Sequence, residues 1–599
     1  MADIIQLLPD SIANQIAAGE VVQRPASVVK ELMENAIDAG ATNIKVIVKE
    51  AGKTLVQVID DGSGMSETDA RLSFERHATS KIKKAEDLFT LRTMGFRGEA
   101  LASIAAVAQV EMKTRLETRE LGTFLVVEAS EVKKQEHAAL ERGTSISVKN
   151  LFYNIPARRN FLKSNPVEMK HILDEFQRLA LAHPDRSMSI IQNDQTVFDV
   201  QPGKLSQRIV ALFGKSYQQQ LATCQEETEL VSVSGYVGRP ESARRTRGEQ
   251  FLFVNNRFIK SNYLNHAVTT AFEGLLPEGT FPFYVLFISI DPKHIDVNVH
   301  PTKTEIKFDD ERAVYAVVRA SVRQALGAHN LSPAIDFSSD VNVISKLSAS
   351  ERKVQDTYYE EQFGNSLGKS NLANWEKLFD QSALSGVRSD ETQKAAIRFE
   401  SSLNQQSYDM PVEERLVFQL HNRYLIRGVK DGLMIMDQQA VHERVLYEKF
   451  LLNMKSSTGN SQQSLFPQTI ELSPADFALV LEIENEVKAL GFRFEVFGKN
   501  ALLVSGIPAG ITMGEKELFE GLIEQFKHNQ SHLSVPLKEN LARSLAKRAS
   551  IKTGQKLKKE EMEALVEGLF ACNNPNFSPE GTPTFFIFDT SKIEGCFNR

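Results

Sequence analysis

A long polar segment divides this 599-residue chain into two regions that have the composition of folded protein. Residues 331–410 are rich in Ser, Asn, Gln and charged residues, and their apolar residues follow no sustained period. The segment predicts a flexible linker, and a random coil of this length spans about 50 Å on average. On either side of it, strand-like and helix-like patterns alternate, which indicates α/β folds.

The overall charge of the chain does not indicate nucleic-acid binding. The formal net charge is −7 and the pI is near 6.0, whereas DNA-binding domains usually have a basic face. Any contact with DNA would have to come from local patches, of which the clearest are residues 541–560 and 241–250. A run of basic residues is also common on an ordinary solvated surface.

The cysteines and the N-terminus bear on the cellular compartment. Cys224, Cys572 and Cys596 are widely spaced and odd in number, which argues against a disulfide framework and a thiolate-rich zinc site. The N-terminus lacks the basic start of a secretory signal, and no stretch reaches the ~18 apolar residues of a membrane span. We therefore expect a cytoplasmic protein without a membrane partner.

The segment PASVVKELMENAIDAG predicts a helix that begins at Pro25 and stops at Gly40. Within it, Glu31, Asn35 and Asp38 are spaced i, i+4 and i+7, so they share one face beside an apolar strip. A carboxylate and an amide then point in the same direction. Taken alone, this spacing favours an ordinary solvated helix face.

Glycine-rich and polar segments follow this helix in a fixed order. Residues 60–64, DDGSG, come directly after a strand and would let the backbone approach a flat ligand, or form a simple turn. Residues 95–107, GFRGEALASIAAV, place glycines before a helix whose free N–H groups favour phosphate. Between them, RHATSKI at 76–82 is typical of a lid or an exposed loop, and Gly143-Thr144 opens the strand GTSISV. The order predicts phosphate binding.

These signals together resemble the Bergerat ATP-binding fold of gyrase, heat-shock chaperones, histidine kinases and MutL proteins. The site is not a Walker P-loop, because no GxxxxGK[ST] occurs. The MutL branch is the most similar, through NQIAAGEVVQRPASVVKELMENAIDAGAT, RHATSKI, GFRGEALASI, LFYNIPARRNFL and VNVHPTK. These segments extend the resemblance over residues 1 to about 330.

The resemblance implies a role for each residue of the site, with ATP and Mg²⁺ as cofactors. Glu31 would be the general base for the attacking water, Asn35 would hold Mg²⁺, and Asp60 would accept a hydrogen bond from the adenine amino group. Lys303 would reach from the second domain to the γ-phosphate, where a cation stabilises the transferring group; the alternative is a lysine at a hairpin tip. The base pocket, the phosphate cradle and its lid would comprise Gly62, Gly64, Thr144, Thr79, Ser80, Lys81, Gly95, Phe96, Arg97, Gly98, Glu99, Ala100 and Leu101.

The resemblance also implies an architecture and a function. The fold would be α/β (α+β), with a GHKL ATPase sandwich at 1–205, a ribosomal-protein-like transducer domain at 206–330, the linker at 331–410 and an α/β dimerisation domain at 411–599. The protein would be a mismatch-repair mediator: a homodimeric, slowly hydrolysing ATP switch that couples a MutS-like sensor to strand incision and excision. It would act at the nucleoid with DNA, a helicase and a separate nuclease. Arg257 and Lys260 are candidates for contact with DNA phosphates.

Residues 437–448, DQQAVHERVLYE, resemble the DQHA(x)₂E(x)₄E motif of MutL proteins that are endonucleases. Gln439 stands where the family has a metal-binding His, and an amide is a poorer ligand than imidazole for zinc or manganese. Glu443 is retained, but this single carboxylate does not make a metal site. His442 and Glu580 could serve as substitute ligands.

The other nuclease segments are also altered. Residues 546–548, AKR, stand in place of an ACK-type sequence, and residues 578–583, SPEGTP, stand in place of CPHGRP. The ending FNR at 597–599 still resembles the FxR of the nuclease branch. We therefore expect no intrinsic endonuclease activity; the alternative is a metal-dependent nicking endonuclease with a degenerate metal site.

Residues 462–467, QQSLFP, resemble the QxxLxP peptide that binds the replication sliding clamp, with Gln462, Leu465 and Pro467 as candidate contacts.

Two other functional classes share the ATP-binding fold. A general chaperone is disfavoured by the PARR and VNVHPTK segments, and a sensor kinase by the lack of a membrane or receiver-like region.

Overall fold

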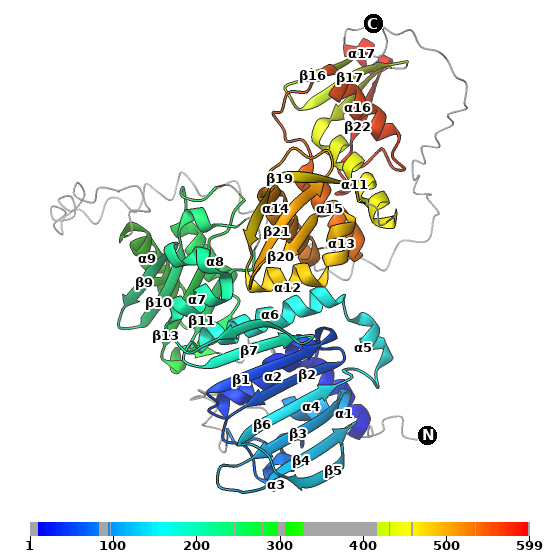
Figure 1. The fold of residues 1–599 in the computed structure, drawn as a ribbon. Coiled ribbons are helices and arrows are strands. Elements are labelled where there is room, and N and C mark those ends of the chain that lie inside the picture. Colours follow the sequence, from blue (N-terminus) through cyan, green and yellow to red (C-terminus); the bar gives the residue numbers. More distant parts are fainter. Residues whose placement is uncertain are drawn as a thin grey trace, which may run out of the picture. The chain divides into compact units, whose positions relative to one another are not determined.

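The computed structural model describes residues 10–82, 94–95, 98–244, 247–277, 279–296, 306–328, 416–430, 432–456, 459–532 and 535–596. The predicted linker, Lys303, Phe96, Arg97 and the FNR ending therefore lie outside the described residues. Figure 1 shows the order of the elements along the chain. Within the described part, no helix has the length and hydrophobicity that a membrane span requires.

The N-terminal region is built on an eight-stranded sheet with the order β5-β4-β3-β6-β2-β1-β7-β8. Alternate residues of the central strands are buried, so one face of the sheet is covered. The strands are β1 (Asn43–Lys49), β2 (Leu55–Asp60), β3 (Gln109–Arg115), β4 (Gly122–Glu128), β5 (Glu131–Ala138), β6 (Gly143–Lys149), β7 (Ser187–Gln192) and β8 (Gln195–Val200). The helices of this region include α1 (Asp10–Val21), α2 (Pro25–Asp38), α3 (Glu67–Leu72), α4 (Ala100–Val107), α5 (Pro156–Phe161) and α6 (Asn165–Ala182) (Figure 1).

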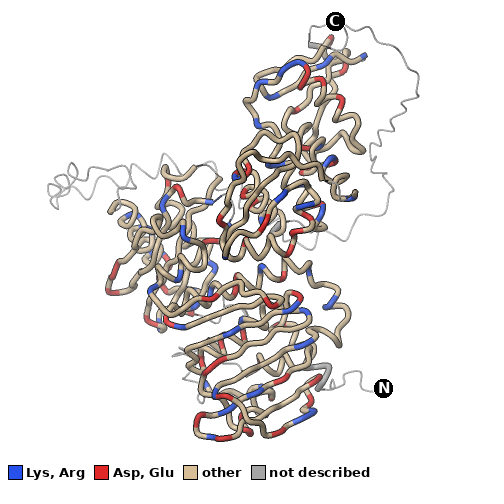
Figure 2. Tube along the Cα trace, viewed as in Figure 1, with Lys and Arg blue, Asp and Glu red and all other residues tan. Residues whose placement is uncertain are grey.

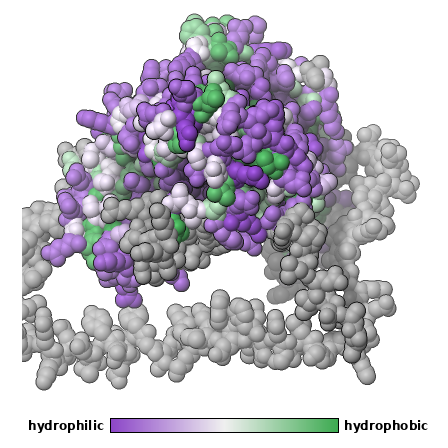
Figure 3. All heavy atoms as spheres, turned by 90° about the horizontal axis from the view of Figure 1, so that it is seen from below, coloured by the Kyte–Doolittle hydropathy of each residue, from purple (hydrophilic) through white to green (hydrophobic). Residues whose placement is uncertain are grey.

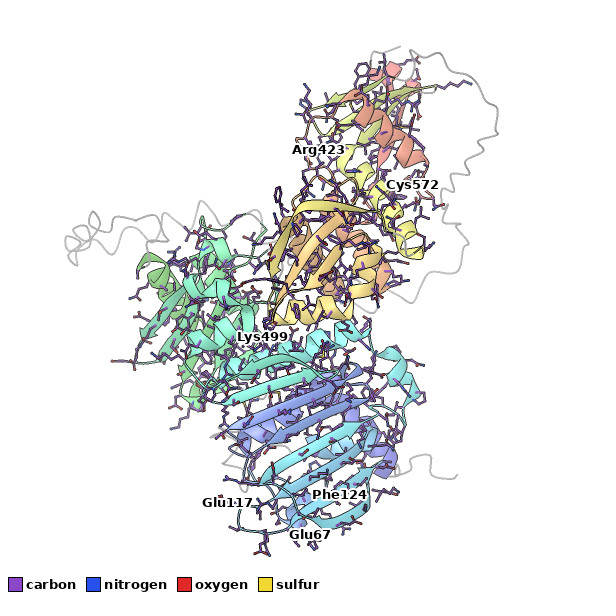
Figure 4. The ribbon with its side chains drawn as sticks, in the orientation of Figure 1. Glu67, Glu117, Phe124, Arg423, Lys499 and Cys572 are labelled. Carbon is purple, nitrogen blue, oxygen red and sulfur yellow. The ribbon has the colours of Figure 1, made fainter. Side chains whose placement is uncertain are left out.

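The opposite face of the sheet carries polar side chains. Phe124 of β4, labelled in Figure 4, lies on this face. The ammonium groups of Lys113 and Lys134, on the two flanking strands, are each 5.7 Å from the centre of its ring. The long cationic side chains cover the aromatic ring and keep their charges in water.

The predicted helix over residues 25–40 is confirmed. Helix α2 begins with Pro25 in its first turn, and Gly40, just beyond its end, has φ +73°. Glycine adopts this left-handed conformation without the steric cost that a Cβ imposes. The buried face of α2, which includes Val28 and Leu32, packs into the core between α6 and the sheet.

The second region has a five-stranded sheet with the order β12-β11-β13-β10-β9. Its strands are β9 (Leu221–Glu227), β10 (Val231–Gly238), β11 (Gln250–Val254), β12 (Arg257–Ile259) and β13 (Tyr284–Ile290). Helices α8 (Asn262–Ala271) and α9 (Glu311–Ala328) pack against each other, and α9 packs on β9 and β10. Helix α7 (Leu205–Phe213) precedes the region, and a short pair, β14 (Ile295–Asp296) and β15 (Lys307–Phe308), leads into α9.

The C-terminal region contains two sheets with separate hydrophobic cores. The four-stranded sheet has the order β16-β17-β18-β22, formed by β16 (Val417–Leu420), β17 (Tyr424–Val429), β18 (Gly432–Asp437) and β22 (Phe585–Asp589). The three-stranded sheet has the order β19-β21-β20, formed by β19 (Ser461–Glu471), β20 (Arg493–Val496) and β21 (Ala501–Pro508). The helices are α11 (Gln438–Ser456), α12 (Pro474–Glu482), α13 (Glu484–Ala489), α14 (Glu515–His532), α15 (Leu537–Ala549), α16 (Lys559–Phe570) and α17 (Thr590–Cys596).

Charged residues of both signs are interspersed along the whole described chain (Figure 2). The face seen in Figure 3 is largely hydrophilic, with scattered hydrophobic residues. This mixture agrees with the modest net charge of the sequence. Contacts with an anionic partner would therefore depend on a few positioned cations.

Candidate nucleotide-binding site

An open cavity of ≈ 1430 Å³ lies at the helical side of the eight-stranded sheet. Its lining includes most of the residues predicted from the sequence. The predicted lining residues are Glu31, Asn35, Asp60, Gly64, Thr79, Ser80, Lys81, Gly95, Gly98, Glu99, Ala100, Leu101 and Thr144, together with Arg257 and Lys260 of the second region. Six separate segments of the sequence therefore converge on one cavity.

Asp60 lies at the end of β2 and forms one end of the site. Burial raises the pKa of its carboxyl to about 6, although backbone N–H groups of Gly62 and Thr144 act in the opposite direction. Gly62 does not line the cavity, but its N–H donates to Asp60 Oδ1 at 2.9 Å. A half-buried carboxylate at the end of a strand can accept a hydrogen bond from a planar ligand.

The loop after Asp60 is held against the neighbouring strands. Gly64 has φ +68°, and a Cβ at this position would lie 2.1 Å from the carbonyl oxygen of Arg115. Thr114 accepts a hydrogen bond from the N–H of Met65 at 2.9 Å and donates to the carbonyl of Gly143 at 3.2 Å. The sequence analysis missed Thr114, because a lone Thr in a strand carries no motif signal.

The opposite end of the cavity is suited to phosphate. Helix α4 begins at Ala100, and its N-cap residue Glu99 makes no side-chain capping bond to the first turn. The helix N-terminus therefore has main-chain donors and a positive dipole end available for an anion. Gly98 has φ +62° and its carbonyl accepts the N–H of His77 at 3.1 Å, which joins the segment before α4 to the RHATSKI segment.

Glu31 and Asn35, both on α2, also line the cavity. The ammonium of Lys30 lies 3.8 Å from Glu31 and 3.7 Å from Glu34. Burial lowers the pKa of Lys30, but Glu34 and Glu31 outweigh it and the net direction is upward. Asn35 Oδ1 lies 3.2 Å from the ammonium of Lys81, so this oxygen already faces a cation.

The two residues predicted to contact DNA lie at the rim of the same cavity. Arg257 donates to the carbonyl oxygen of Met94 at 3.1 Å. Beside it, the guanidinium of Arg178 on α6 lies 4.2 Å from the ring of Phe258 on β12. These contacts connect the second region to the wall of the cavity, and sequence reasoning did not find Met94 or Arg178.

In the C-terminal region, the residues that remain of the nuclease motif make protein contacts. Asp437 caps α11 by accepting the N–H groups of Gln439 and Ala440, each at 3.0 Å. His442 Nδ1 accepts the N–H of Ile551 at 3.0 Å, and burial lowers the pKa of His442 to about 4. Gln439 accepts a hydrogen bond from the Thr553 hydroxyl at 3.3 Å.

Glu443 and Glu580 face a lysine that occupies the altered AKR segment. Lys547 forms an ion pair with Glu580, and Glu443 is only 5% exposed. Burial, with Glu580 adding, raises the pKa of Glu443 to about 7. In the described part of the chain, no group of three or more His, Cys, Asp or Glu side chains could hold a metal ion.

The clamp-like motif lies on β19, at the edge of the three-stranded sheet. The pairing of β19 with β21 is interrupted between Gln463 and Gln468, so the intervening residues bulge out of the ladder. Leu465 is 91% exposed and Phe466 is 82% exposed. Gln462 and Pro467 are exposed as well.

Family models match three parts of the chain. Residues 23–155 match the histidine kinase-, DNA gyrase B- and HSP90-like ATPase, residues 209–327 match the C-terminal domain of DNA mismatch repair protein, and residues 417–557 match the MutL C-terminal dimerisation domain. Among solved structures, the N-terminal domain of a DNA repair protein is 23% identical and covers 53% of this chain and 99% of that chain, with a TM-score of 0.47.

Curated relatives match over the full length. The DNA mismatch repair protein MutL of Flavobacterium psychrophilum is 45% identical over 613 residues, which are 100% of both chains. The MutL protein of Bacteroides fragilis is 43% identical, again over 100% of both chains. The chain therefore belongs to the MutL family of DNA mismatch repair proteins, with a GHKL ATPase domain and a C-terminal dimerisation domain.

Proposed function

We propose that the cavity binds ATP with Mg²⁺ and that its residues act as the sequence predicts. The observation that supports this most is the convergence of Glu31, Asn35, Asp60 and the N-terminus of α4 on one cavity. Asp60 would accept the adenine amino group, which distinguishes adenine from guanine because guanine has an oxygen at that position. Lys303 lies outside the described residues, and its contact with the γ-phosphate remains a prediction.

Asn35 suits the metal ion. Its Oδ1 faces the Lys81 ammonium at 3.2 Å, and Mg²⁺ prefers oxygen ligands, with phosphate and water oxygens completing an octahedron. Bound Mg²⁺ would neutralise charge on the triphosphate. Together with Lys81, the backbone N–H groups in the first turn of α4 would donate to the phosphates.

Glu31 would act on the water that attacks the γ-phosphate. Its carboxylate takes a proton from the water as the new oxygen–phosphorus bond forms and the bond to ADP breaks, which leaves ADP and inorganic phosphate. The neighbouring Lys30 ammonium, 3.8 Å away, can orient this carboxylate. We expect turnover to be slow, because the reaction serves as a timer rather than as a source of product.

We further propose a homodimer that forms through the outer face of the four-stranded sheet. Strand registers place Phe418, Ile426, Ile435 and Phe586 in one row across all four strands. Phe418 is 61% exposed and Phe586 is 63% exposed. A continuous apolar row on one face of a sheet is an interaction surface, and a second copy supplies the same surface about a two-fold axis.

The alternation of residues along these strands shows that this face is the outer one. The residues that alternate with it, Val417, Leu425, Met434 and Met436, are at most 7% exposed and contact the core below. Arg423, labelled in Figure 4, stands at the β16–β17 turn, where its guanidinium lies 5.1 Å from the ring of Tyr424. The apolar face is thus bordered by charge, as interfaces commonly are.

In mismatch repair, the chain would couple a MutS-like sensor to downstream incision and excision, with a helicase and a separate nuclease as partners. Arg257 and Lys260 would contact DNA phosphates. The exposed Leu465 and Phe466, on their bulge, would provide apolar anchors for a sliding clamp. Action at the nucleoid in the cytoplasm agrees with this role.

A single experiment separates this function from the endonuclease alternative. Purified protein is incubated with supercoiled plasmid, Mn²⁺ and ATP, while phosphate release and nicking are followed in the same tube. We expect phosphate without nicks, and we expect Glu31→Ala to bind ATP while phosphate release falls at least a hundredfold. Nicking that disappears in Glu443→Ala would establish the nuclease instead, and normal turnover in Glu31→Ala would remove Glu31 from its role.

A further inference from the structure

The carboxylate of Asp38 collects three donors from two separate segments of the nucleotide site. Its Oδ1 accepts the N–H of Met94 at 3.0 Å, and its Oδ2 accepts the N–H of Gly95 at 3.1 Å. The ammonium of Lys81 lies 2.5 Å from the same Oδ2. The Asp38 side chain is 7% exposed, so these bonds form largely away from water.

Asp38, Asn35, Lys81 and Gly95 form one packed cluster. The Lys81 ammonium touches both Asp38 and, at 3.2 Å, Asn35 Oδ1. A Cβ on Gly95 would lie 3.3 Å from that ammonium and 3.9 Å from both Asn35 and Asp38. The residue proposed to hold Mg²⁺ and the carboxylate one turn further along α2 therefore share one cation.

Helix stability does not account for Asp38. It is the last residue of α2, and a carboxylate at a helix C-terminus opposes the helix dipole. A direct contact with phosphate does not explain an acidic residue at this position either, because both groups are negative. The bonds of the Asp38 carboxylate to Met94, Gly95 and Lys81 explain it, since each is a charge-assisted hydrogen bond.

The Met94 peptide is also held from its other side. Its carbonyl oxygen accepts a hydrogen bond from Arg257 at 3.1 Å, while its N–H donates to Asp38. The position of the Gly95 N–H at the phosphate end of the cavity therefore depends on Asp38 and on Arg257 of the second region.

We propose that Asp38 is a positioning residue for the nucleotide. It fixes the Met94–Gly95 backbone and holds the Lys81 ammonium on Asn35, so that Mg²⁺ and Lys81 compete for the same amide oxygen. Lys81, displaced from Asn35 by a metal ion bound there, would become available to the phosphates of the nucleotide. This inference rests on the proposed ATP site and deepens it.

The test measures binding and main-chain protection rather than activity. Fluorescent N-methylanthraniloyl-ADP is titrated into the full chain at several Mg²⁺ concentrations, and hydrogen exchange is followed by mass spectrometry. For Asp38→Ala we expect ADP affinity to fall at least tenfold, with faster exchange confined to the peptide that contains Met94 and Gly95. Asp38→Asn, which keeps the size of the side chain, should show a smaller loss of the same kind.

Lys81→Met tests the competition directly. Without the ammonium, half-saturation at high ADP should need several times less Mg²⁺ than in the wild-type protein. Asp194→Ala removes a carboxylate that is 84% exposed and should match the wild type in every measurement. If both Asp38 variants retain wild-type affinity and exchange, or if the Mg²⁺ requirement of Lys81→Met is unchanged, the inference is wrong. Failure of the wild type to bind ADP would instead contradict the proposed ATP site itself.

Discussion

The affinity for adenine nucleotide should depend on the protonation of Asp60. Burial raises the pKa of this carboxyl to about 6, so the unliganded protein takes up a proton there in a pH range in which an exposed Asp remains ionised. Because the folded-state pKa is raised, Asp60 favours the folded state at low pH, and this contribution is lost as the pH rises through about 6. Adenine recognition needs the opposite form, since the ionised carboxylate is the stronger acceptor for the amino group.

The size of the effect follows from this pKa. If only the protein with an ionised Asp60 binds ADP, the fraction of protein in this form falls from about nine-tenths at pH 7 to about one-tenth at pH 5. Affinity for ADP should then fall about tenfold over these two pH units, which corresponds to about 1.4 kcal/mol. Isothermal titration at fixed Mg²⁺ measures this directly.

The phosphates of ADP titrate in the same range, so the comparison needs a variant that lacks only the carboxylate. Asp60→Asn keeps the shape of the side chain and removes the titration, while the phosphate titration is common to both proteins. The ADP affinity of the wild type divided by that of Asp60→Asn should therefore be about tenfold smaller at pH 5 than at pH 7. A ratio that does not change with pH would refute the predicted dependence of nucleotide binding on the ionisation of Asp60 in this pH range.

Three further predictions concern local packing and assembly. Gly64→Ala should abolish ADP binding in titrations, because its Cβ would lie 2.1 Å from the Arg115 carbonyl oxygen; wild-type affinity would show that the loop can move. Phe586→Lys should shift the full chain from dimer to monomer in sedimentation velocity, because it places a charge in the apolar row, and an unchanged dimer would exclude this face. Ser544→Ala should lower the unfolding free energy of the C-terminal region by about 1–3 kcal/mol in urea, because it removes the buried acceptor of Asn529. An unchanged urea midpoint would mean that Asn529 finds another partner.

Local sequence determined the parts of the nucleotide site that depend on short-range geometry. The spacing of Glu31, Asn35 and Asp38 fixes a shared helix face, because a residue seven positions on completes nearly two turns. Pro25 and Gly40 mark the limits of this helix, because proline has a fixed φ that suits the first turn and glycine readily adopts a positive φ beyond the last turn. The fixed order of the glycine-rich and polar segments predicted phosphate binding, and its resemblance to the Bergerat fold implied the ATPase class, which the family matches confirm.

Contacts between distant segments were decided by the tertiary structure. Asp38 was predicted to lie on the polar face of α2, but its bonds to Lys81, Met94 and Gly95 depend on how the chain returns to α2. Arg257 was predicted as a contact for DNA phosphates, whereas its partner in the structure is the Met94 carbonyl of another region of the chain. The same holds for the apolar row that includes Phe586, since four strands must align before it exists. Periodicity specifies which side of an element a residue occupies, whereas the packing of elements in three dimensions specifies what that side meets.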